Sequence, residues 1–400
     1  MRVLTLTTST NNGGAAKVAV QLHQSISKSV EAALVSQDTI LATSPPIQRQ
    51  FLFFYFAFKR KVARLLTIFD QLESKVYKSY SIFPSRIPRL VSQFNPDIVH
   101  LHWVQGEFLS IEDISKINKP IVWTLHDCWP LSASEHHQLD STFHFLSFYQ
   151  HLSPLSPSKI TFLRKTLSWN RSNLHFIAPS QWMHEKISTS FMANSSHSSI
   201  IPNPLDLDTF KRSNRLQTRQ KYGWVNEEKI ILLGSLASPD DPIKGIDLAI
   251  SIFSLLSQTD LTYKLVTVGS PPPRIANLAN HTHLGLINDP HNMANLYSAS
   301  DLVVVPSRIE THSQTAAESI ACGTPVIAFN IAGNSSVIQQ GVSGSLIPPF
   351  QCLDFCNEIL YILGDDVPYP PHQVSSASKQ WAASQIADLH IQLYNKILSS

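Results

Sequence analysis

The stretch DLVVVPSRIETHSQTAAESIACGTPVIAF, residues 301–329, decides the fold class. It opens with a short run of branched apolar residues ending in Pro-Ser, which is typical of a parallel strand buried on both faces. A loop follows over 307–313, and residues 314–321 can form a helix that ends at Cys322-Gly323. A second apolar strand completes the stretch. This succession predicts an α/β domain with a parallel sheet.

Two carboxylates of this stretch, Glu310 and Glu318, stand on either side of the predicted start of the helix. A helix that begins at Ser313, Gln314 and Thr315, just beyond a parallel strand, points free N–H groups and a partial positive charge into the crevice there. Such a place would hold a phosphate well, and Glu318 could accept hydrogen bonds from two vicinal hydroxyls such as those of a ribose. The alternative is an ordinary surface glutamate on an amphipathic helix.

The spacing E-x7-E followed by A-C-G-T-P-V-I-A resembles the donor-binding signature of retaining glycosyltransferases, family 4 (glycosyl transferases group 1) in particular. The resemblance covers nearly the whole chain and implies the α/β architecture called GT-B. In that fold two Rossmann-like domains with parallel sheets face each other across a cleft, and a C-terminal helix crosses back to the first domain. We therefore expect an acceptor-side domain over 1–205, a nucleotide-sugar domain over 206–375 and a returning helix over 376–400.

Length and composition agree with this expectation. Four hundred residues exceed what a single hydrophobic core usually supports, so two domains are the natural prior. The net charge of +2, without a basic stripe, gives no sign of a nucleic-acid partner. Four cysteines without C-x-x-C spacing fit a reducing cytoplasm, and Met1-Arg2 leads straight into a strand rather than into a signal peptide. We expect a cytoplasmic protein.

A Gly-Gly pair follows the first predicted strand, residues 2–7, and precedes a helix predicted over 15–29. Glycine is scarce in this chain, with 13 in 400 residues. Gly13 and Gly14 therefore indicate positive φ or a close approach to a ligand, although a plain β-α turn would also explain one of them. In the family that the chain resembles, this loop faces the phosphates of the donor.

Residues 49–78 combine an aromatic cluster with basic side chains. Basic heads beside aromatic rings suit a helix on a membrane surface, which would place the protein peripherally at the inner face of the membrane. A helix that packs on its own sheet with a basic edge would have a similar sequence. Both interpretations stay open at this point.

Two further strands are predicted over 97–102 and 120–125, with a helix near 111–118 between them. A right-handed crossover brings the ends of both strands to one edge of the sheet. Four side chains are then expected at that edge: His102, Trp103, His126 and Asp127. The motif TLHDCWPLS resembles a subgroup that acts in polysaccharide and colanic-acid assembly, in which His126 would lie against the transferred sugar. A purely structural histidine is the alternative.

The segment 132–166 is rich in histidine: His136, His137, His144 and His151. No carboxylate or cysteine accompanies them at ligand-like spacing, so we expect no metal site. Acceptor recognition is the favoured use of this segment, because long loops often carry specificity.

The second half holds ten of the thirteen glycines and alternates strands with helices. Its Lys244-Gly245 matches the K-G of related enzymes, whose lysine contacts the diphosphate. A compact ammonium can neutralise a leaving group of that kind. The chain also departs from the family pattern at several positions: Pro204, Ser235, His312, Ser313 and Ser335.

Taken together, the resemblance implies a retaining enzyme that moves a hexose from a nucleotide-diphosphate donor to a saccharide or lipid-linked acceptor in cell-surface glycan synthesis. It would need no metal and no cofactor. The implied catalytic residues are Glu310, His126 and Lys244, and the implied donor-binding residues are Gly13, Gly14, Ser313, Gln314, Thr315 and Glu318. The alternatives are a degenerate protein that binds a nucleotide sugar or glycan without turnover, and a nucleotide-sugar epimerase of the same fold.

Overall fold

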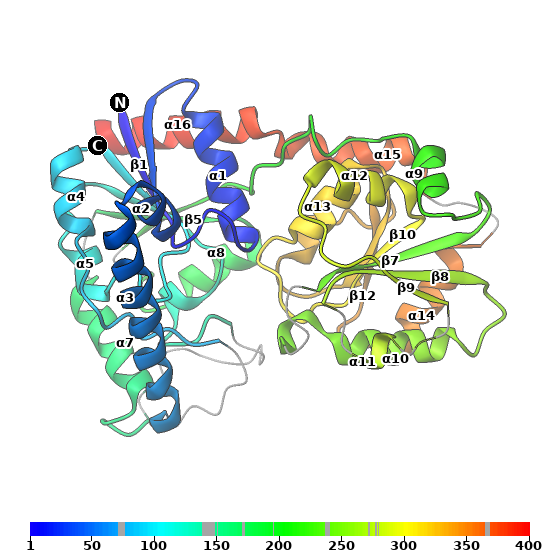
Figure 1. The fold of residues 1–400 in the computed structure, drawn as a ribbon, viewed down its shortest axis with the longest axis horizontal. Helices are drawn as coiled ribbons and strands as arrows, with labels where there is room; N and C mark the ends of the chain where they lie inside the picture. The colour runs from blue at the N-terminus through cyan, green and yellow to red at the C-terminus, as the bar shows by residue number, and fades with distance from the viewer. Residues whose placement is uncertain are drawn as a thin grey trace. The chain divides into compact units, whose positions relative to one another are not determined.

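The computed structural model divides into two compact units. The first unit comprises Met1–Pro204 and Ser384–Ser400, and the second comprises Leu205–Ala383. The structure describes residues 1–70, 77–137, 149, 151–169, 173–194, 196–236, 241–270, 273–276, 278, 280–364 and 369–400. Each unit has its own sheet and its own core (Figure 1).

The sheet of the first unit has six strands in the order β2-β1-β3-β4-β5-β6, and all of its pairs are parallel. The strands are β1 (Arg2–Leu6), β2 (Glu31–Val35), β3 (Ile98–Leu101), β4 (Ile121–Thr124), β5 (Leu174–Ala178) and β6 (His197–Ile200). Side chains of one strand alternate between the two faces, as they must in a pleated sheet. On β1, for example, Val3 packs into one buried cluster and Leu4 into another.

Helices cover both faces of this sheet, while one helix, α3 (Pro46–Leu65), projects from it. The other helices of the unit are α1 (Gly14–Ile26), α2 (Gln37–Thr43), α4 (Ile87–Phe94), α5 (Ile111–Ser115), α7 (Pro157–Ser168), α8 (Gln181–Ser188) and α16 (Ala383–Ser399), with short 3-10 turns at Leu66–Phe69 and Trp129–Leu131. The final helix α16 crosses back to the first unit, as the family resemblance implies. Its Ile386 and Tyr394 are buried with Val3 and Ile98 of the sheet, so the end of the chain completes the core of its beginning.

The sheet of the second unit is also six-stranded and parallel, in the order β12-β11-β10-β7-β8-β9. Its strands are β7 (Lys229–Leu236), β8 (Tyr263–Gly269), β9 (His281–His283), β10 (Leu302–Val305), β11 (Val326–Phe329) and β12 (Gly344–Ile347). Residues Leu302–Val305 and Val326–Phe329 are fully buried, as the apolar runs of the opening stretch predict.

Two layers of helices enclose this second sheet. Figure 1 shows α9 (Arg215–Lys221), α12 (Pro290–Ala299), α13 (Gln314–Ala321) and α15 (Pro371–Ser376) above it, and α10 (Ile246–Leu256), α11 (Pro273–Ala276) and α14 (Cys352–Ile362) below it. Single 3-10 turns occur at Pro242–Lys244, Ala332–Ser336 and Ala377–Trp381. The sequence therefore predicts the class and the layers correctly.

The structure corrects one local expectation. Residues 376–400 do not form one helix, because Ala382, with φ −51° and ψ 126°, separates the 3-10 turn Ala377–Trp381 from α16. This break lets Leu205 bond to the backbone on both sides, donating to Trp381 O at 2.7 Å and accepting from Ala383 N at 3.1 Å. After the second strand, Ser36 begins α2 with a reciprocal capping box to Thr39.

Candidate active site

Each sheet has one position at which the direction of the chain's winding reverses. In the second unit this lies between β7 and β10, and in the first unit between β1 and β3. Open α/β sheets bind their ligands beyond the carboxyl ends of the strands at such a switch point. Gly13 and Gly14 follow β1, Lys244 follows β7, and Glu310 and the start of α13 follow β10, in agreement with the topology. His126 follows β4, the neighbour of β3.

At the switch point of the second unit, Lys244 and Glu310 form an ion pair with Nζ to Oε1 at 2.8 Å. The charge of Glu310 raises the pKa of Lys244 and outweighs the opposing effect of burial. Both residues line a small hollow together with Thr315. The remaining lining comes from the ends of the two strands and the loop after β10: Gly234, Val305, Pro306 and Ser307.

Glycine at 245 explains how the lysine reaches this hollow. Gly245 has φ +63°, and a Cβ added there would lie 2.1 Å from the carbonyl oxygen of Pro306. No other residue would let the Lys-Gly turn pack so closely against the end of β10. Glu310 is held from the other side, because Gly333 N donates to its backbone oxygen at 2.7 Å. The Lys244–Glu310 ion pair is therefore held from both sides, by the packing of Gly245 against Pro306 and by the hydrogen bond from Gly333 to Glu310.

Helix α13 begins beside the hollow, as predicted. Ser313 is its N-cap, and its hydroxyl accepts from Ala316 N at 3.4 Å. Gln314 and Thr315 are its first two residues, and Thr315 lines the hollow. The departure from the family pattern at Ser313 thus supplies a favourable capping residue. The neighbouring His312 is buried, and its ring lies perpendicular to that of Trp381 with the centroids 5.9 Å apart.

Glu318 is not among the residues that line the hollow. It is only 5% exposed, and its carboxylate accepts a hydrogen bond from the hydroxyl of Tyr297 at 3.0 Å. Burial raises the pKa of Tyr297 well above its ordinary value, and the charge of Glu318 raises it further. Tyr297 belongs to α12 and lies 21 positions away, so sequence reasoning missed it. No local pattern pointed to it.

In the first unit, Gly13 is the N-cap of α1 and Gly14 is its first residue, and both are exposed. Gly13 has φ 87° and ψ 165°, a combination that is essentially restricted to glycine. The preceding residues are anchored by Asp38, whose Oδ2 accepts from Ser9 Oγ at 2.6 Å and from Thr10 N at 2.7 Å. Sequence reasoning missed Asp38, although Ser9 and Thr10 are donors that need a partner.

His102 follows β3 and His126 follows β4, and the two side chains are in contact. Their Nε2 and Nδ1 atoms are 3.0 Å apart, and their rings are stacked at 5.3 Å. Burial lowers the pKa of His126 to about 4, although Asp127 acts in the opposite direction. Trp103 Nε1 also donates to Asp127 at 2.7 Å. The expectation that these four side chains share one edge is confirmed.

In the histidine-rich segment, His136 is held by two hydrogen bonds, while the use of the segment in acceptor recognition stays a prediction. His136 bonds to Asp127 through Nδ1 at 2.6 Å and to Ser79 through Nε2 at 2.8 Å. His151 is exposed, and His144 lies outside the described residues. Among the residues that the structure describes, no three potential ligands come together in a way that could hold a metal ion.

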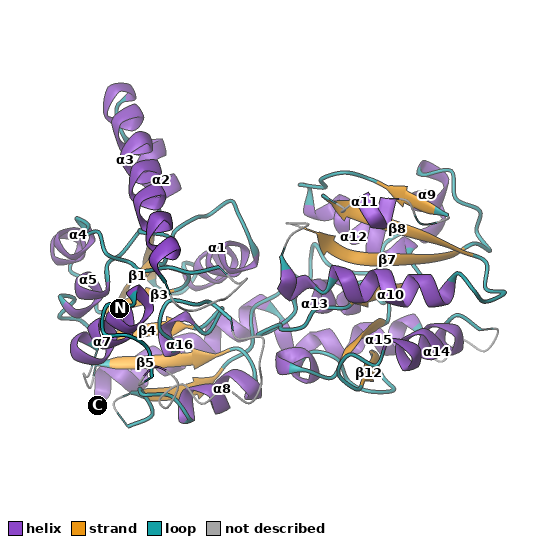
Figure 2. Ribbon diagram, turned by 90° about the horizontal axis from the view of Figure 1, so that it is seen from below, coloured by secondary structure: helices purple, strands orange, loops and turns teal. Residues whose placement is uncertain are grey.

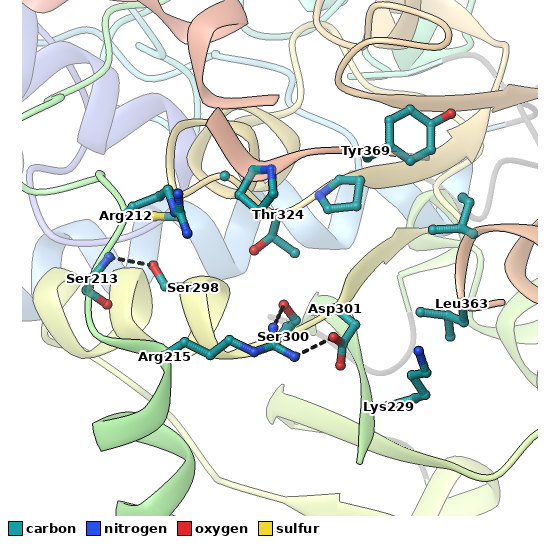
Figure 3. A pocket seen from close by; sticks show the side chains of 15 residues that line it. Arg212, Ser213, Arg215, Lys229, Ser298, Ser300, Asp301, Thr324, Leu363 and Tyr369 are labelled. Carbon is teal, nitrogen blue, oxygen red and sulfur yellow. Dashed lines mark hydrogen bonds and ion pairs between the residues drawn. The ribbon is translucent and has the colours of Figure 1, made fainter. Parts of the chain in front are cut away.

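A second hollow lies at the opposite edge of the second sheet, where β10 and β11 begin (Figure 3). Its lining includes Asp301, which binds both Arg215 and Arg219 and also accepts from Ile230 N at 2.7 Å. None of the predicted site residues lines this hollow. Asp301 thus joins the start of β10 to the start of β7 and to α9.

The segment 49–78 exposes many large apolar side chains. Helix α3 projects from the sheet (Figure 2), and of its residues only Lys59 and Ala63 are buried. Many of its large apolar side chains are exposed: Ile47, Phe51, Phe53, Phe54, Tyr55, Phe58 and Leu65. The chain thus does not use α3 as an ordinary sheet-covering helix. Residues 71–76 of this segment lie outside the described ranges.

Lys59 is the one basic residue of α3 that is buried. Its ammonium lies over the rings of Tyr55, Phe56 and Phe83 at 5.3 to 5.9 Å, and burial lowers its pKa. Within the described ranges, none of the helices combines the length and apolar character that crossing a membrane requires.

Comparison with known proteins identifies the family. Residues 12–209 match the model described as Glycosyltransferase Family 4, and residues 227–365 match Glycosyl transferases group 1. A lipopolysaccharide 1,2-N-acetylglucosaminetransferase of Salmonella typhimurium is 28% identical over 47% of this chain and 52% of its own. D-inositol 3-phosphate glycosyltransferase 1 of Catenulispora acidiphila is 34% identical over 36% of this chain and 38% of its own. The matches thus span about half, or less, of these relatives.

Solved structures show the same fold over the whole chain. Anabaena Alr3699/HepE in complex with UDP-glucose has a TM-score of 0.68 at 18% identity, covering 99% of this chain and 100% of that chain. Sucrose-phosphate synthase from Thermosynechococcus elongatus has a TM-score of 0.66 at 17% identity, covering 100% of this chain and 99% of that one. The colanic-acid subgroup stays a prediction. The two family models and the shared fold show that this protein belongs to the family 4 (group 1) glycosyltransferases of GT-B architecture.

Proposed function

We propose that this protein transfers a hexose from a nucleotide-diphosphate donor to a saccharide or lipid-linked acceptor in the assembly of a polysaccharide or other cell-surface glycan. The observation that carries the proposal is the Lys244–Glu310 ion pair in a hollow beside the N-terminus of α13. A fixed cation and a helix N-terminus suit a diphosphate, while an adjacent carboxylate suits sugar hydroxyls. The names of the relatives, a lipopolysaccharide and an inositol-phosphate glycosyltransferase, support this class of reaction.

In this proposal the diphosphate is stabilised by Lys244 and by the amide groups of Ser313, Gln314 and Thr315. The ammonium is most useful as the bond to the sugar breaks, because negative charge then gathers on the leaving oxygen. The Gly13–Gly14 loop of the first unit is proposed to contact the phosphates as well. Its exposed backbone and its lack of side chains permit a close approach.

Glu318 is proposed to bind the two hydroxyls of the donor's ribose. Its buried carboxylate has more than one lone pair, so the bond from Tyr297 leaves acceptor capacity for further donors. Glu310 and His126 are proposed to orient the sugar. Glu310 would then exchange part of its bond with Lys244 for bonds to sugar hydroxyls.

We further propose retention of the anomeric configuration without a metal ion. The leaving diphosphate would itself accept the proton of the incoming hydroxyl on the same face of the sugar, so this route requires no general-base side chain. Lys244 and the helix N-terminus would take the place of a divalent cation in balancing charge. Product anomers assigned by proton NMR test retention, and turnover that persists in excess chelator tests the metal-free route.

We also propose that α3 contacts the inner face of a membrane. Its sequence holds basic residues and no acidic one. Phe51, Phe54 and Phe58 lie at helical spacing and are 69%, 61% and 59% exposed. Exposed aromatic rings flanked by basic side chains are suited to the headgroup region of an anionic bilayer. Such a contact would bring the protein close to a lipid-linked acceptor.

The decisive experiment is a screen of labelled nucleotide sugars for binding, followed by product analysis with the donor that binds. A transferase releases free nucleoside diphosphate rapidly only when an acceptor is added. An epimerase converts the donor alone, and a pure binder does neither. The binder alternative has one observation in its favour: among the residues that the structure describes, Lys244 is the only cation lining the hollow, and it is already paired with Glu310.

A further inference from the structure

Four histidines are packed into one column inside the first unit: His100, His102 and His390 are buried, and His126 is half-buried. Starting from α16, the ring centroid of His390 lies 5.5 Å from that of His100, that of His100 lies 4.4 Å from that of His102, and that of His102 lies 5.3 Å from that of His126. His126 is the one that is proposed to contact the sugar. The column therefore joins that residue to the core.

The pleat of β3 places the side chains of His100 and His102 on the same side of the sheet. The two residues stand two positions apart at the end of this strand. His100 has both ring nitrogens occupied, by Tyr394 Oη at 2.6 Å and Thr124 Oγ1 at 2.8 Å. It meets His102 through its ring face and offers no acceptor atom to it. The orientation of His102 is thereby fixed by stacking on one side and by His126 on the other.

The hydrogen bond between His102 and His126 contains one proton. Burial lowers the pKa of His102 well below its ordinary value, and His100 and His126 lower it further. The pKa of His126 is lowered to about 4, also by burial. Both rings are therefore neutral at pH 7, and each carries one N–H and one bare nitrogen.

Two arrangements of that proton are possible, and they differ at the far nitrogen of His102. If His126 donated from Nε2, His102 would carry its own hydrogen on Nε2. That atom is buried, and no described group forms a hydrogen bond with it. An orphaned buried N–H is rarer in proteins than an orphaned acceptor. If His102 donates from Nδ1 instead, only a lone pair is left without a partner.

We propose that His102 is a positioning residue that holds the proton of His126 on Nδ1. His126 then acts toward the substrate as a hydrogen-bond donor at Nδ1, and its Nε2 is occupied by His102. The residue thus binds an oxygen atom of the sugar or acceptor and takes no proton from it. This inference deepens the proposed function and rests on it for the identity of the substrate.

Nitrogen-15 NMR of the full chain with labelled histidine tests the proton position directly. The signals of His126 are assigned from their loss in His126→Gln. We expect a protonated Nδ1 and a bare Nε2 in His126 at pH 7, and a protonated Nδ1 in His102. A proton on Nε2 of His126 would overturn the proposal. This readout does not depend on turnover, so an inactive protein with the expected tautomer would count against the function and not against His102.

Three substitutions then separate positioning from simple packing. In His102→Asn the side-chain amide keeps a donor close to the position of Nδ1, so the tautomer and the turnover should stay near those of the wild type. In His102→Asp an acceptor replaces the donor, the proton of His126 should move to Nε2, and kcat should fall by about tenfold or more, as the loss of one hydrogen bond implies. His102→Leu should leave the two tautomers mixed.

His175→Asn is the matched control, because His175 lies on β5 and bonds to Ser199 at 3.0 Å without touching the column. It should change neither the tautomer of His126 nor the turnover. Equal losses of kcat in His102→Asn and His102→Asp, with an unchanged tautomer in both, would show a purely structural role and overturn the proposal.

Discussion

Tyr297 and Glu318 hold each other in place inside the second unit: the tyrosine hydroxyl donates to the carboxylate at 3.0 Å, and both side chains are buried. A buried carboxylate is costly unless it is hydrogen-bonded. Tyr297 therefore orients the carboxylate of Glu318, which we propose to bind hydroxyls of the donor.

We predict that Glu318→Ala weakens donor binding by about 1.5–3 kcal/mol, which is typical of hydrogen bonds to a charged group. Tyr297→Phe should weaken it by about 1 kcal/mol, because the carboxylate stays but loses its orienting partner. Calorimetric titration with the nucleoside diphosphate measures both. Tyr361→Phe is the control, since Tyr361 is 63% exposed and should bind the donor like the wild type. Unchanged affinity in Glu318→Ala would refute the ribose role.

Lys244→Ala should lower kcat by about 100-fold, the scale expected when one stabilising group is removed from a developing anion. Its affinity for the nucleoside without phosphates should hardly change, because the ammonium is assigned to the diphosphate. Steady-state kinetics and nucleoside titration check the two quantities. Lys264→Ala is the matched control, because Lys264 also forms an ion pair, with Glu228 at 2.9 Å. Parallel losses of turnover and nucleoside affinity would speak against a leaving-group role.

Gly13→Ala should destabilise the protein by about 1–3 kcal/mol through backbone strain alone. A Cβ at Gly13 would meet no atom within 4 Å, so a clash contributes nothing. Gly14→Ala is the control, since Gly14 lies within α1, where alanine is favoured over glycine. Thermal unfolding distinguishes the two. Equal melting temperatures would show that the positive φ at Gly13 carries no strain.

The buried histidines predict that the free energy of unfolding falls in mild acid. Burial lowers the pKa of His390 to about 4, and His100 and Tyr394 are packed against its ring. In the unfolded chain the pKa of a histidine is about 6.5, so the unfolded state binds more protons than the folded state between pH ~4 and ~6.5. The histidine's contribution to the free energy of unfolding is therefore fully present above pH ~6.5 and declines as the pH falls toward ~4. Each such histidine contributes about 1.4 kcal/mol per pH unit in that window.

Denaturant unfolding between pH 7 and pH 5 measures this slope. His390→Gln should flatten it by the share of one histidine, while His151→Gln should leave it unchanged because His151 is exposed. A slope identical in the wild type and His390→Gln would contradict the assignment.

Flotation with liposomes tests the membrane proposal. The wild type should rise with anionic vesicles at low salt and less with neutral ones. Phe51→Ser combined with Phe54→Ser and Phe58→Ser should abolish flotation. Leu163→Ser with Leu167→Ser is the control, because these residues of α7 are 46% and 84% exposed in the same unit. A wild type that stays wholly in the soluble fraction would refute the contact.

Much of the fold follows from local patterns. The branched run Leu302–Val305 and the stop at Cys322-Gly323 specify the central unit, and alternating strands and helices imply both sheets. The crossover rule places His102 beside His126, although they are 24 positions apart.

What sequence reasoning missed depends on contacts between elements. Tyr297 meets Glu318 only because α12 packs beside α13, and Asp38 reaches Ser9 only because β2 pairs with β1. The break at Ala382 arises from its neighbours' bonds to Leu205, far away in the chain. Neither periodicity nor capping signals contain such information.

The return of α16 also sets the order in which the units can be completed during synthesis. The ribosome adds every residue of the second unit, Leu205–Ala383, before it adds Tyr394, whose hydroxyl bonds to His100. The first unit is thus begun first and finished last. A chain truncated after residue 383 should therefore show a protease-resistant second unit and a susceptible first one.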